Sequence, residues 1–146
     1  MKARLVTQIA INATSADVFR YLSNLKYHYL WNPHLRSISK TTNLEQGMAY
    51  QSSSLLLGVR VRGNNVVTKL LPNKELELEN KTGALQYKVN YQLRSAKEKT
   101  LLTCTTTVFS ESNAFAFTTP VLKLLARREL QTDLQALKIS VEKQLK

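Results

Sequence analysis

The sequence predicts an α+β domain in which one curved antiparallel sheet of about seven strands is closed by a long C-terminal helix. Three observations support this fold: apolar and polar residues alternate in strand-like segments, turn residues recur at regular intervals, and an apolar seam of helical spacing ends the chain. A single sheet this long must curl, and a helix laid across its concave face leaves space between the two layers. We therefore expect a protein that binds an apolar small molecule in the space between the sheet and the helix.

The first predicted strand covers about residues 4–11, because its side chains alternate with a period of two. One face is expected to be buried and the other exposed. Leu5, Thr7, Ile9 and Ile11 lie on one side, and Val6, Gln8 and Ala10 lie on the other.

Two short helices are expected next. Thr14 precedes Asp17 by three residues, which is close to a capping box and favours a helix start at this point. A second short helical turn is predicted over residues 25–30. Pro33 then removes a backbone donor and moves Asn32 out of helical geometry, so the helical segment ends at the sequence Trp31-Asn32-Pro33.

The segment from Leu35 to Glu111 predicts an antiparallel meander of short strands. Its clearest strand starts at Leu85, where every second side chain is apolar, so Tyr87 and Tyr91 are expected to point inward. Turns are predicted near Gly47, Gly58, Pro72-Asn73, Gly83 and Lys97-Glu98-Lys99.

Two details of this meander are expectations about burial. Glu75, Glu77 and Glu79 alternate with leucines, so all three carboxylates are expected in water, as a surface run rather than a catalytic cluster. The second detail is a β-bulge, predicted at Gly63-Asn64-Asn65, because an unbroken alternation beyond these residues would bury Lys69.

The last helix is predicted to begin at Pro120 after a Thr118 or Thr119 cap. Its seam consists of Leu122, Ala126, Leu130, Leu134, Leu137, Val141 and Leu145. Additional apolar residues lie off the seam next to basic ones. These residues are Val121, Leu124 and Leu125, with Phe115 and Phe117 before them and Lys123, Arg127 and Arg128 beside them.

Three explanations of this apolar excess stay open: the preceding loop folds back over the helix start, two copies associate, or the segment docks on an anionic membrane. Our hypothesis is that the region forms the gate of the cavity, with Phe117 at its entrance.

Composition predicts one domain spanning residues 1–146. The single Cys104 cannot form an internal disulfide, the basic N-terminus lacks the apolar core of a secretion signal, and no apolar run is long enough to span a membrane. We expect a cytoplasmic protein, either a monomer or a homodimer.

The net charge of +11 raises the question of an anionic partner. Residues 1–74 contain ten basic residues and only two acidic ones, Asp17 and Glu45. The basic residues are dispersed, so a solvated surface is favoured over a partner site. Nucleic acid is not expected as a partner, because the sequence has no recognition-helix pattern and no exposed aromatic platform. Contacts with RNA or a ribosome would come from Arg36, Lys40, Arg60 and Arg62.

No catalytic constellation is evident, and the catalytic residues are unknown from sequence. Cys104 lies in a strand-like run, soft metal ligands are too few for a metal centre, and no glycine-rich phosphate loop occurs, so we expect no cofactor. Acid–base chemistry by His34 or by tyrosines that reach the cavity, Tyr50, Tyr87 and Tyr91, is the remaining catalytic option. Glu129 and Asp133 share a helix face and are interpreted as a solvated pair on its flank.

The stretch from Val6 to Leu25, followed by Trp31-Asn32-Pro33, resembles the opening of START-like (SRPBCC) proteins, the polyketide cyclase/dehydrase and lipid-transport superfamily. Gly47, Pro72 and the C-terminal helix extend the resemblance over the whole chain. It implies a helix-grip fold with a hydrophobic cavity between sheet and helix, but no single activity, because the superfamily includes carriers, cyclases and ligand-binding proteins.

Together these observations favour binding or transport of a small hydrophobic ligand, such as a lipid, a quinone or a polyketide-like compound. The alternatives are a polyketide cyclase/dehydrase-type enzyme that uses Tyr and His groups in the cavity, or a basic surface that binds RNA, a ribosome or an anionic membrane. An enzyme predicts a buried ionisable group facing the cavity, whereas a carrier predicts an apolar wall with hydroxyls only. The ligand-binding residues are predicted to be Trp31, Tyr87, Tyr91, Phe117, Leu122 and Leu125.

Overall fold

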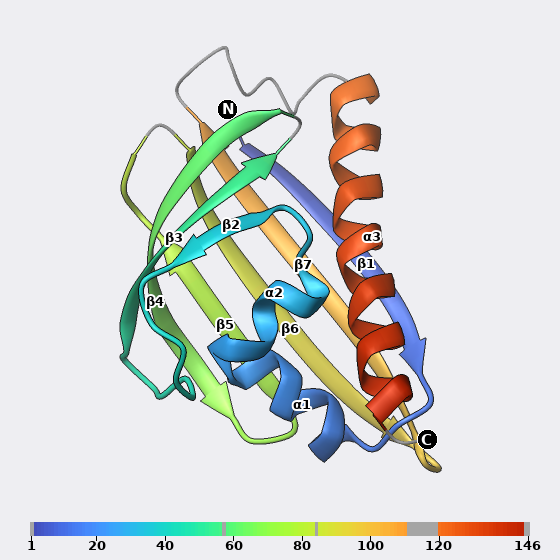
Figure 1. Ribbon diagram of the computed structural model, residues 1–146. Helices are drawn as coiled ribbons and strands as arrows, with labels where there is room; N and C mark the ends of the chain where they lie inside the picture. Colours follow the sequence, from blue (N-terminus) through green and yellow to red (C-terminus); the bar gives the residue numbers. More distant parts are fainter. Residues whose placement is uncertain (1, 57, 84, 111–119, 145–146) are drawn as a thin grey trace.

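The computed structural model describes residues 2–56, 58–83, 85–110 and 120–144 (Figure 1). Seven antiparallel strands form one curved sheet in the order β1-β7-β6-β5-β4-β3-β2, which confirms the predicted fold class. The strands are β1 (Lys2–Ile11), β2 (Leu35–Ile38), β3 (Ala49–Leu56), β4 (Val59–Leu71), β5 (Glu75–Asn80), β6 (Leu85–Ala96) and β7 (Lys99–Ser110).

The short helices after β1 also form as predicted. α1 (Ser15–Ser23) begins where the Thr14 side chain accepts a hydrogen bond from the Asp17 backbone nitrogen, at 3.2 Å. The 3₁₀ turn η1 (Leu25–Tyr27) and α2 (His28–Trp31) follow. The helices α1 and α2 lie at the same end of the sheet as the C-terminal part of α3 (Figure 1). The chain then enters the sheet at β2. Trp31, at the end of α2, is buried in the core.

The long helix α3 (Pro120–Gln144) packs alongside β1 (Figure 1). Of its predicted seam, Ala126, Leu134, Leu137 and Val141 are buried and Leu130 is partly buried. The side chain of Leu122 and residue Leu145 lie outside the described part. None of the described helices is both long and apolar enough to cross a membrane.

The buried core is divided into two clusters. The larger one joins α1, α2 and the C-terminal half of α3 to the sheet, and includes Trp31, Tyr91 and Leu134. The smaller one, which includes Leu85 and Ala126, lies near the start of α3. A core split in this way leaves incomplete packing between its two parts.

The predicted bulge occurs at a different place. Pairing of β3 with β4 continues without a break through residues 63–65, and the register shifts only between Val67 and Lys69, where β4 pairs with β5. The prediction was wrong because Asn65 is buried, so the strand keeps its alternation for longer than a polar residue suggested. The shift at Thr68 then turns Lys69 outward.

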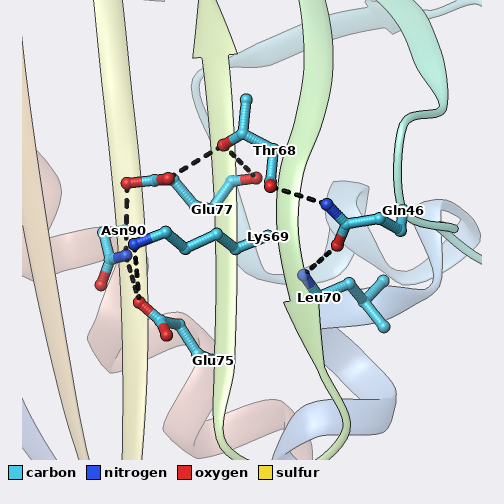
Figure 2. Close-up of polar contacts among 7 residues, drawn as sticks. All are labelled: Gln46, Thr68, Lys69, Leu70, Glu75, Glu77 and Asn90. Atoms are coloured by element: carbon cyan, nitrogen blue, oxygen red, sulfur yellow. Dashed lines mark hydrogen bonds and ion pairs between the residues drawn. The ribbon is translucent and has the colours of Figure 1, made fainter.

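Side chains satisfy the backbone at this bulge, as Figure 2 shows. The Gln46 amide donates to the Thr68 carbonyl at 2.7 Å and accepts from the Leu70 nitrogen at 2.8 Å. These two bonds satisfy backbone groups on the side of β4 that faces away from β5, beyond the start of β3 at Ala49.

The same figure corrects the expectation that all three β5 carboxylates lie in water. Glu77 is only 7% exposed, and its carboxylate accepts hydrogen bonds from Thr68 Oγ1 at 3.0 Å and from Asn90 Nδ2 at 3.4 Å. Glu75 accepts from Asn90 at 2.8 Å and pairs with Lys69 across the strands at 3.9 Å. On the convex face of the sheet, Glu77 is thus buried and hydrogen-bonded by Thr68 and Asn90.

Candidate functional site

A cavity of about 170 Å³ lies between the sheet, α2 and α3. Its lining combines residues of both core clusters, such as Leu78 and Tyr91 from the larger one and Leu85 and Val108 from the smaller one. An apolar protein cavity of about 150 Å³ takes up one benzene molecule. The space therefore suits a ligand group of about one ring.

Trp31 forms part of the cavity wall because α2 ends there, just before Pro33. Its indole nitrogen donates to the Tyr21 carbonyl at 3.1 Å, which satisfies the buried polar end of the ring. The Tyr91 ring meets Trp31 edge to face, with centroids 6.1 Å apart. The two aromatic side chains hold each other in place and present apolar surface to the cavity.

A polar network lies along the β3, β4 and β6 part of the wall. Tyr87 donates from its hydroxyl to Asn65 Oδ1, and Asn65 Nδ2 donates to Ser52 Oγ at 2.9 Å. Gly63 permits this arrangement, because a Cβ at that position would overlap the Tyr87 hydroxyl. Burial raises the pKa of Tyr87, so its hydroxyl remains a neutral hydrogen-bond donor at physiological pH.

The most distinctive feature of the cavity is a pair of polar groups that lack hydrogen-bond partners. His34, in the turn after α2, and Asp133, on α3, both line the cavity. The distance from His34 Nε2 to Asp133 Oδ1 is 3.6 Å, and neither atom makes a hydrogen bond within the described residues. Buried polar atoms usually have partners, so this pair is suited to a polar group of a ligand.

Burial raises the pKa of the Asp133 carboxyl from 3.8 to about 8, with a further contribution from the charge of Glu129. At neutral pH this carboxyl is therefore mainly protonated and can donate a hydrogen bond into the cavity. A carboxyl with its pKa near the working pH, beside an imidazole nitrogen, has the properties of an acid–base pair.

Two other ionisable groups in this region are held in one protonation state. His28 lines the cavity, and burial lowers its pKa to about 4, while its Nε2 donates to the Leu22 carbonyl at 2.8 Å. Burial raises the pKa of the Cys104 thiol to about 12, so it is not a nucleophile at neutral pH. Both side chains serve packing.

The structure brings together three of the six side chains predicted to bind a ligand. Trp31, Tyr87 and Tyr91 all line the cavity, and Tyr50 does so too. Leu125 does not: it is 39% exposed, because the buried face of α3 at this turn is the one that carries Ala126. The side chain of Leu122 and all of Phe117 lie outside the described residues, as does the hypothetical gate loop. A ligand-binding role for these residues stays a prediction.

Sequence reasoning missed Asp133 and Asn65. Asp133 was assigned to a solvated flank, but at 3.6 residues per turn it lies only about 60° from the seam centred on Leu130, Leu134 and Leu137. Its side chain is 14% exposed in the structure. For Asn65, the alternation of β4 could have revealed its burial: Asn65 shares its face of the strand with Val61, Gly63 and Val67, so its side chain points inward.

A known family matches nearly the whole chain: the sequence profile described as "Polyketide cyclase / dehydrase and lipid transport" covers residues 2–142. None of the curated proteins matches the sequence significantly.

Solved structures resemble this one in fold at low sequence identity. The protein TTHA0849 from Thermus thermophilus has a TM-score of 0.83 at 14% identity, over 99% of this chain and 100% of that one. A START superfamily protein from Mycobacterium smegmatis has a TM-score of 0.78 at 15% identity, over 98% and 99%. The Zhui aromatase/cyclase from Streptomyces sp. R1128 has a TM-score of 0.77 at 12% identity, over 100% and 97%. Identities this low demonstrate a shared fold and no more.

Proposed function

This chain belongs to the polyketide cyclase / dehydrase and lipid transport family, and on that premise we propose that it binds a small hydrophobic ligand in its internal cavity. The observation that carries the proposal is the cavity of about 170 Å³, with apolar walls and one unpartnered polar pair, His34 and Asp133. The apolar body of the ligand would lie against Trp31 and Tyr91. Its polar group would lie at the His34–Asp133 pair.

The energetic basis of this proposal has two parts. Apolar surface removed from water contributes about 25 cal/mol per Å². A ligand group that hydrogen-bonds to His34 or Asp133 also removes the cost of leaving buried polar atoms unpaired, which is about 1–3 kcal/mol per group. A ring that carries a carbonyl or a hydroxyl satisfies both requirements.

Native mass spectrometry of freshly purified protein tests whether a ligand is carried from the host, because a bound molecule adds its mass to the chain. Isothermal titration calorimetry with 1-indanone and 1-naphthol then tests the cavity directly. We expect binding of at least one of these probes. If neither probe binds and the purified protein carries no added mass, the proposal is wrong.

A cavity-filling variant locates the binding. Val89 lines the cavity, so Val89→Trp should fill it and weaken probe binding at least tenfold. Val66, which is 40% exposed on β4, provides the matched control, because Val66→Trp adds the same ring outside the cavity. Equal binding by the two variants would place the probe elsewhere on the protein.

A second function is favoured by the same polar pair. An acid–base enzyme requires a buried ionisable group that faces the ligand, and Asp133 is such a group. We propose enolisation as the elementary reaction: the Asp133 carboxyl donates a hydrogen bond to a ligand carbonyl while His34 Nε2 removes a proton from the adjacent carbon. Return of a proton to that carbon restores the ketone and both side chains.

Deuterium exchange separates an enzyme from a carrier. In D₂O the methylene next to the 1-indanone carbonyl should lose its proton NMR signal faster with the protein than without it. Asp133→Asn and His34→Gln should each slow this exchange at least tenfold while still binding the probe. Exchange at the uncatalysed rate despite bound probe would leave ligand binding as the function and exclude this reaction for the probe.

A further inference from the structure

A second cavity, here called the outer groove, lies on the opposite face of the sheet over β2, β3 and β4. It measures about 700 Å³, compared with about 170 Å³ for the internal cavity. Val61 points to the internal cavity, whereas Arg60 and Arg62 on either side of it line the outer groove. The groove is defined here by Ser37, Ser39, Ser53, Arg60, Arg62 and Asn64.

The strand register places three of these side chains in one row. Ser37 on β2 pairs with Ser53 on β3, and Ser53 pairs with Arg62 on β4. Directly paired residues in adjacent antiparallel strands point to the same face, and neighbouring strands are about 4.8 Å apart. The three side chains therefore leave the sheet within about 10 Å of one another, at a spacing that one small molecule can span.

A second polar row runs beside the first. Ser39 Oγ accepts a hydrogen bond from the Gln51 backbone nitrogen at 2.8 Å, and Gln51 pairs with Asn64 across the strands. The Asn64 amide in turn donates to Thr82 Oγ1 at 3.0 Å. These contacts hold hydroxyl and amide groups along the edge of the groove, where they can exchange hydrogen bonds with the hydroxyls of a ligand.

The charge of the groove has one sign. Arg60 and Arg62 are both exposed, and within the part of the chain that the structure describes neither guanidinium has an ion-pair partner. All described residues that line the groove are neutral or basic. A guanidinium presents a planar set of donors that matches phosphate oxygens. The groove is thus complementary to an anion, and to phosphate in particular.

Ser53 provides an independent sign of a missing ligand. Its Oγ is shielded from solvent and makes no hydrogen bond within the described residues. An unpaired buried hydroxyl is costly. Arg62 is paired with Ser53 in the register, so both side chains leave the same face of the sheet next to each other.

We infer that the outer groove binds a phosphorylated polyol, with the phosphate at Arg60 and Arg62 and the polyol hydroxyls along the serine and amide rows. Aromatic side chains, on which nucleobases stack, do not occur among the described lining residues, so a nucleotide fits less well. A free sugar phosphate and the inositol phosphate headgroup of a lipid share the required chemistry.

Isothermal titration calorimetry at low ionic strength tests the inference with three probes: glucose 6-phosphate, inorganic phosphate and glucose. We expect glucose 6-phosphate to bind at least tenfold more tightly than phosphate, and glucose not to bind measurably. Arg62→Ala should weaken glucose 6-phosphate binding at least tenfold and Ser53→Ala about threefold, whereas Arg62→Lys should retain part of it. Equal affinity for glucose 6-phosphate and phosphate would overturn the inference.

The control for net charge is Arg94→Ala, which removes an exposed arginine of β6 outside the groove. The affinity of this variant for glucose 6-phosphate should remain within twofold of the affinity of the unaltered protein. A loss equal to that of Arg62→Ala would mean diffuse attraction by the basic surface and would contradict a specific site. Val89→Trp should also leave this binding unchanged, so the outer groove and the internal cavity are tested separately.

Flotation with phosphatidylcholine vesicles that contain phosphatidylinositol 4-phosphate distinguishes the two sources, with phosphatidylserine vesicles of equal charge as the control. Binding that requires the inositol lipid and is lost in Arg62→Ala assigns a lipid headgroup. Binding of soluble glucose 6-phosphate alone assigns a free compound. Binding in neither experiment excludes the site.

Discussion

Two carboxyl groups are largely buried on opposite sides of the sheet, and they differ in their partners. Glu77, on the convex face, is 7% exposed and accepts hydrogen bonds from Thr68 and Asn90 (Figure 2). Asp133, whose side chain is 14% exposed, faces the internal cavity. Its Oδ1 atom has no hydrogen-bond partner within the described residues and lies 3.6 Å from His34 Nε2.

Glu77 is a structural carboxyl, whereas Asp133 lacks such partners and is the group to which we assign the polar end of the proposed ligand. Hydrogen bonds to a charged group each contribute about 1.5–3 kcal/mol, so the network around Glu77 stabilises the bulge in β4. Asp133 makes no such contribution, and its charged form opposes folding. Buried polar groups without hydrogen-bond partners occur mainly at functional sites. Both carboxyl groups are largely buried, so the lack of partners, and not burial, marks Asp133 as a candidate site residue.

The largest effect is expected from Asp133→Asn, as a change in the pH dependence of stability. Burial raises the Asp133 pKa from 3.8 to about 8, so this group's favourable contribution is complete below about pH 4 and is lost as the pH rises through 8. Between about pH 5 and 8 the unfolding free energy of the unaltered protein should fall, relative to the variant, by about 1 kcal/mol per pH unit. Urea denaturation at four pH values measures this difference, and parallel pH profiles would contradict it.

Glu77→Ala tests the other side of the comparison. Removal of this carboxylate leaves Thr68 and Asn90 without an acceptor, so we expect a loss of about 2 kcal/mol of unfolding free energy at pH 7. Glu98, exposed in the turn between β6 and β7, supplies the control, because Glu98→Ala should change stability by less than about 0.5 kcal/mol. If both variants lose the same amount, the network is not stabilising.

Thr68→Val should have a smaller effect. It removes the hydroxyl that donates to Glu77 but keeps the branched shape, so the expected loss is about 1 kcal/mol. Combining it with Glu77→Ala should cost less than the sum of the two separate losses, because both changes remove the same hydrogen bond. Strict additivity in urea denaturation would show that the two groups are not coupled.

The smallest change in stability is expected from His34→Gln. His34 Nε2 has no hydrogen-bond partner within the described residues, so replacing the ring should alter the unfolding free energy by no more than about 0.5 kcal/mol at pH 7. The same variant should nevertheless weaken 1-naphthol binding severalfold in calorimetry. A large loss of stability with unchanged binding would make His34 a structural residue like Glu77.

Local patterns predicted most of the fold. The Thr14 cap, the alternation of β1 and β6 and the turn positions depend on residues close together in the chain, and the structure confirms them. Backbone geometry agrees at the turns: Gly47 has a φ of 81° and Asn73 a φ of 65°, in the left-handed region that glycine and asparagine tolerate.

The errors concerned polar residues whose burial depends on distant segments. Asn65 was expected to mark a bulge, yet it lies inside because Ser52 and Tyr87 satisfy its amide. Glu77 was expected in water, yet Asn90 and Thr68 from the adjacent strands pair with it. In each case the partner lies at least nine residues away in sequence, so no pattern within the strand could reveal it.

The sequence by itself determined the strands, the Thr14 cap of α1, the buried seam of α3 and the order that makes the sheet curl, because these follow from backbone conformational preferences and from the spacing of apolar side chains. Only the tertiary structure decided that Asp133 of α3 meets His34 from the turn after α2, and that three strands align Ser37, Ser53 and Arg62. Such placements depend on how separate elements pack and register against one another, and the solvation and pairing of each polar group follow from that packing.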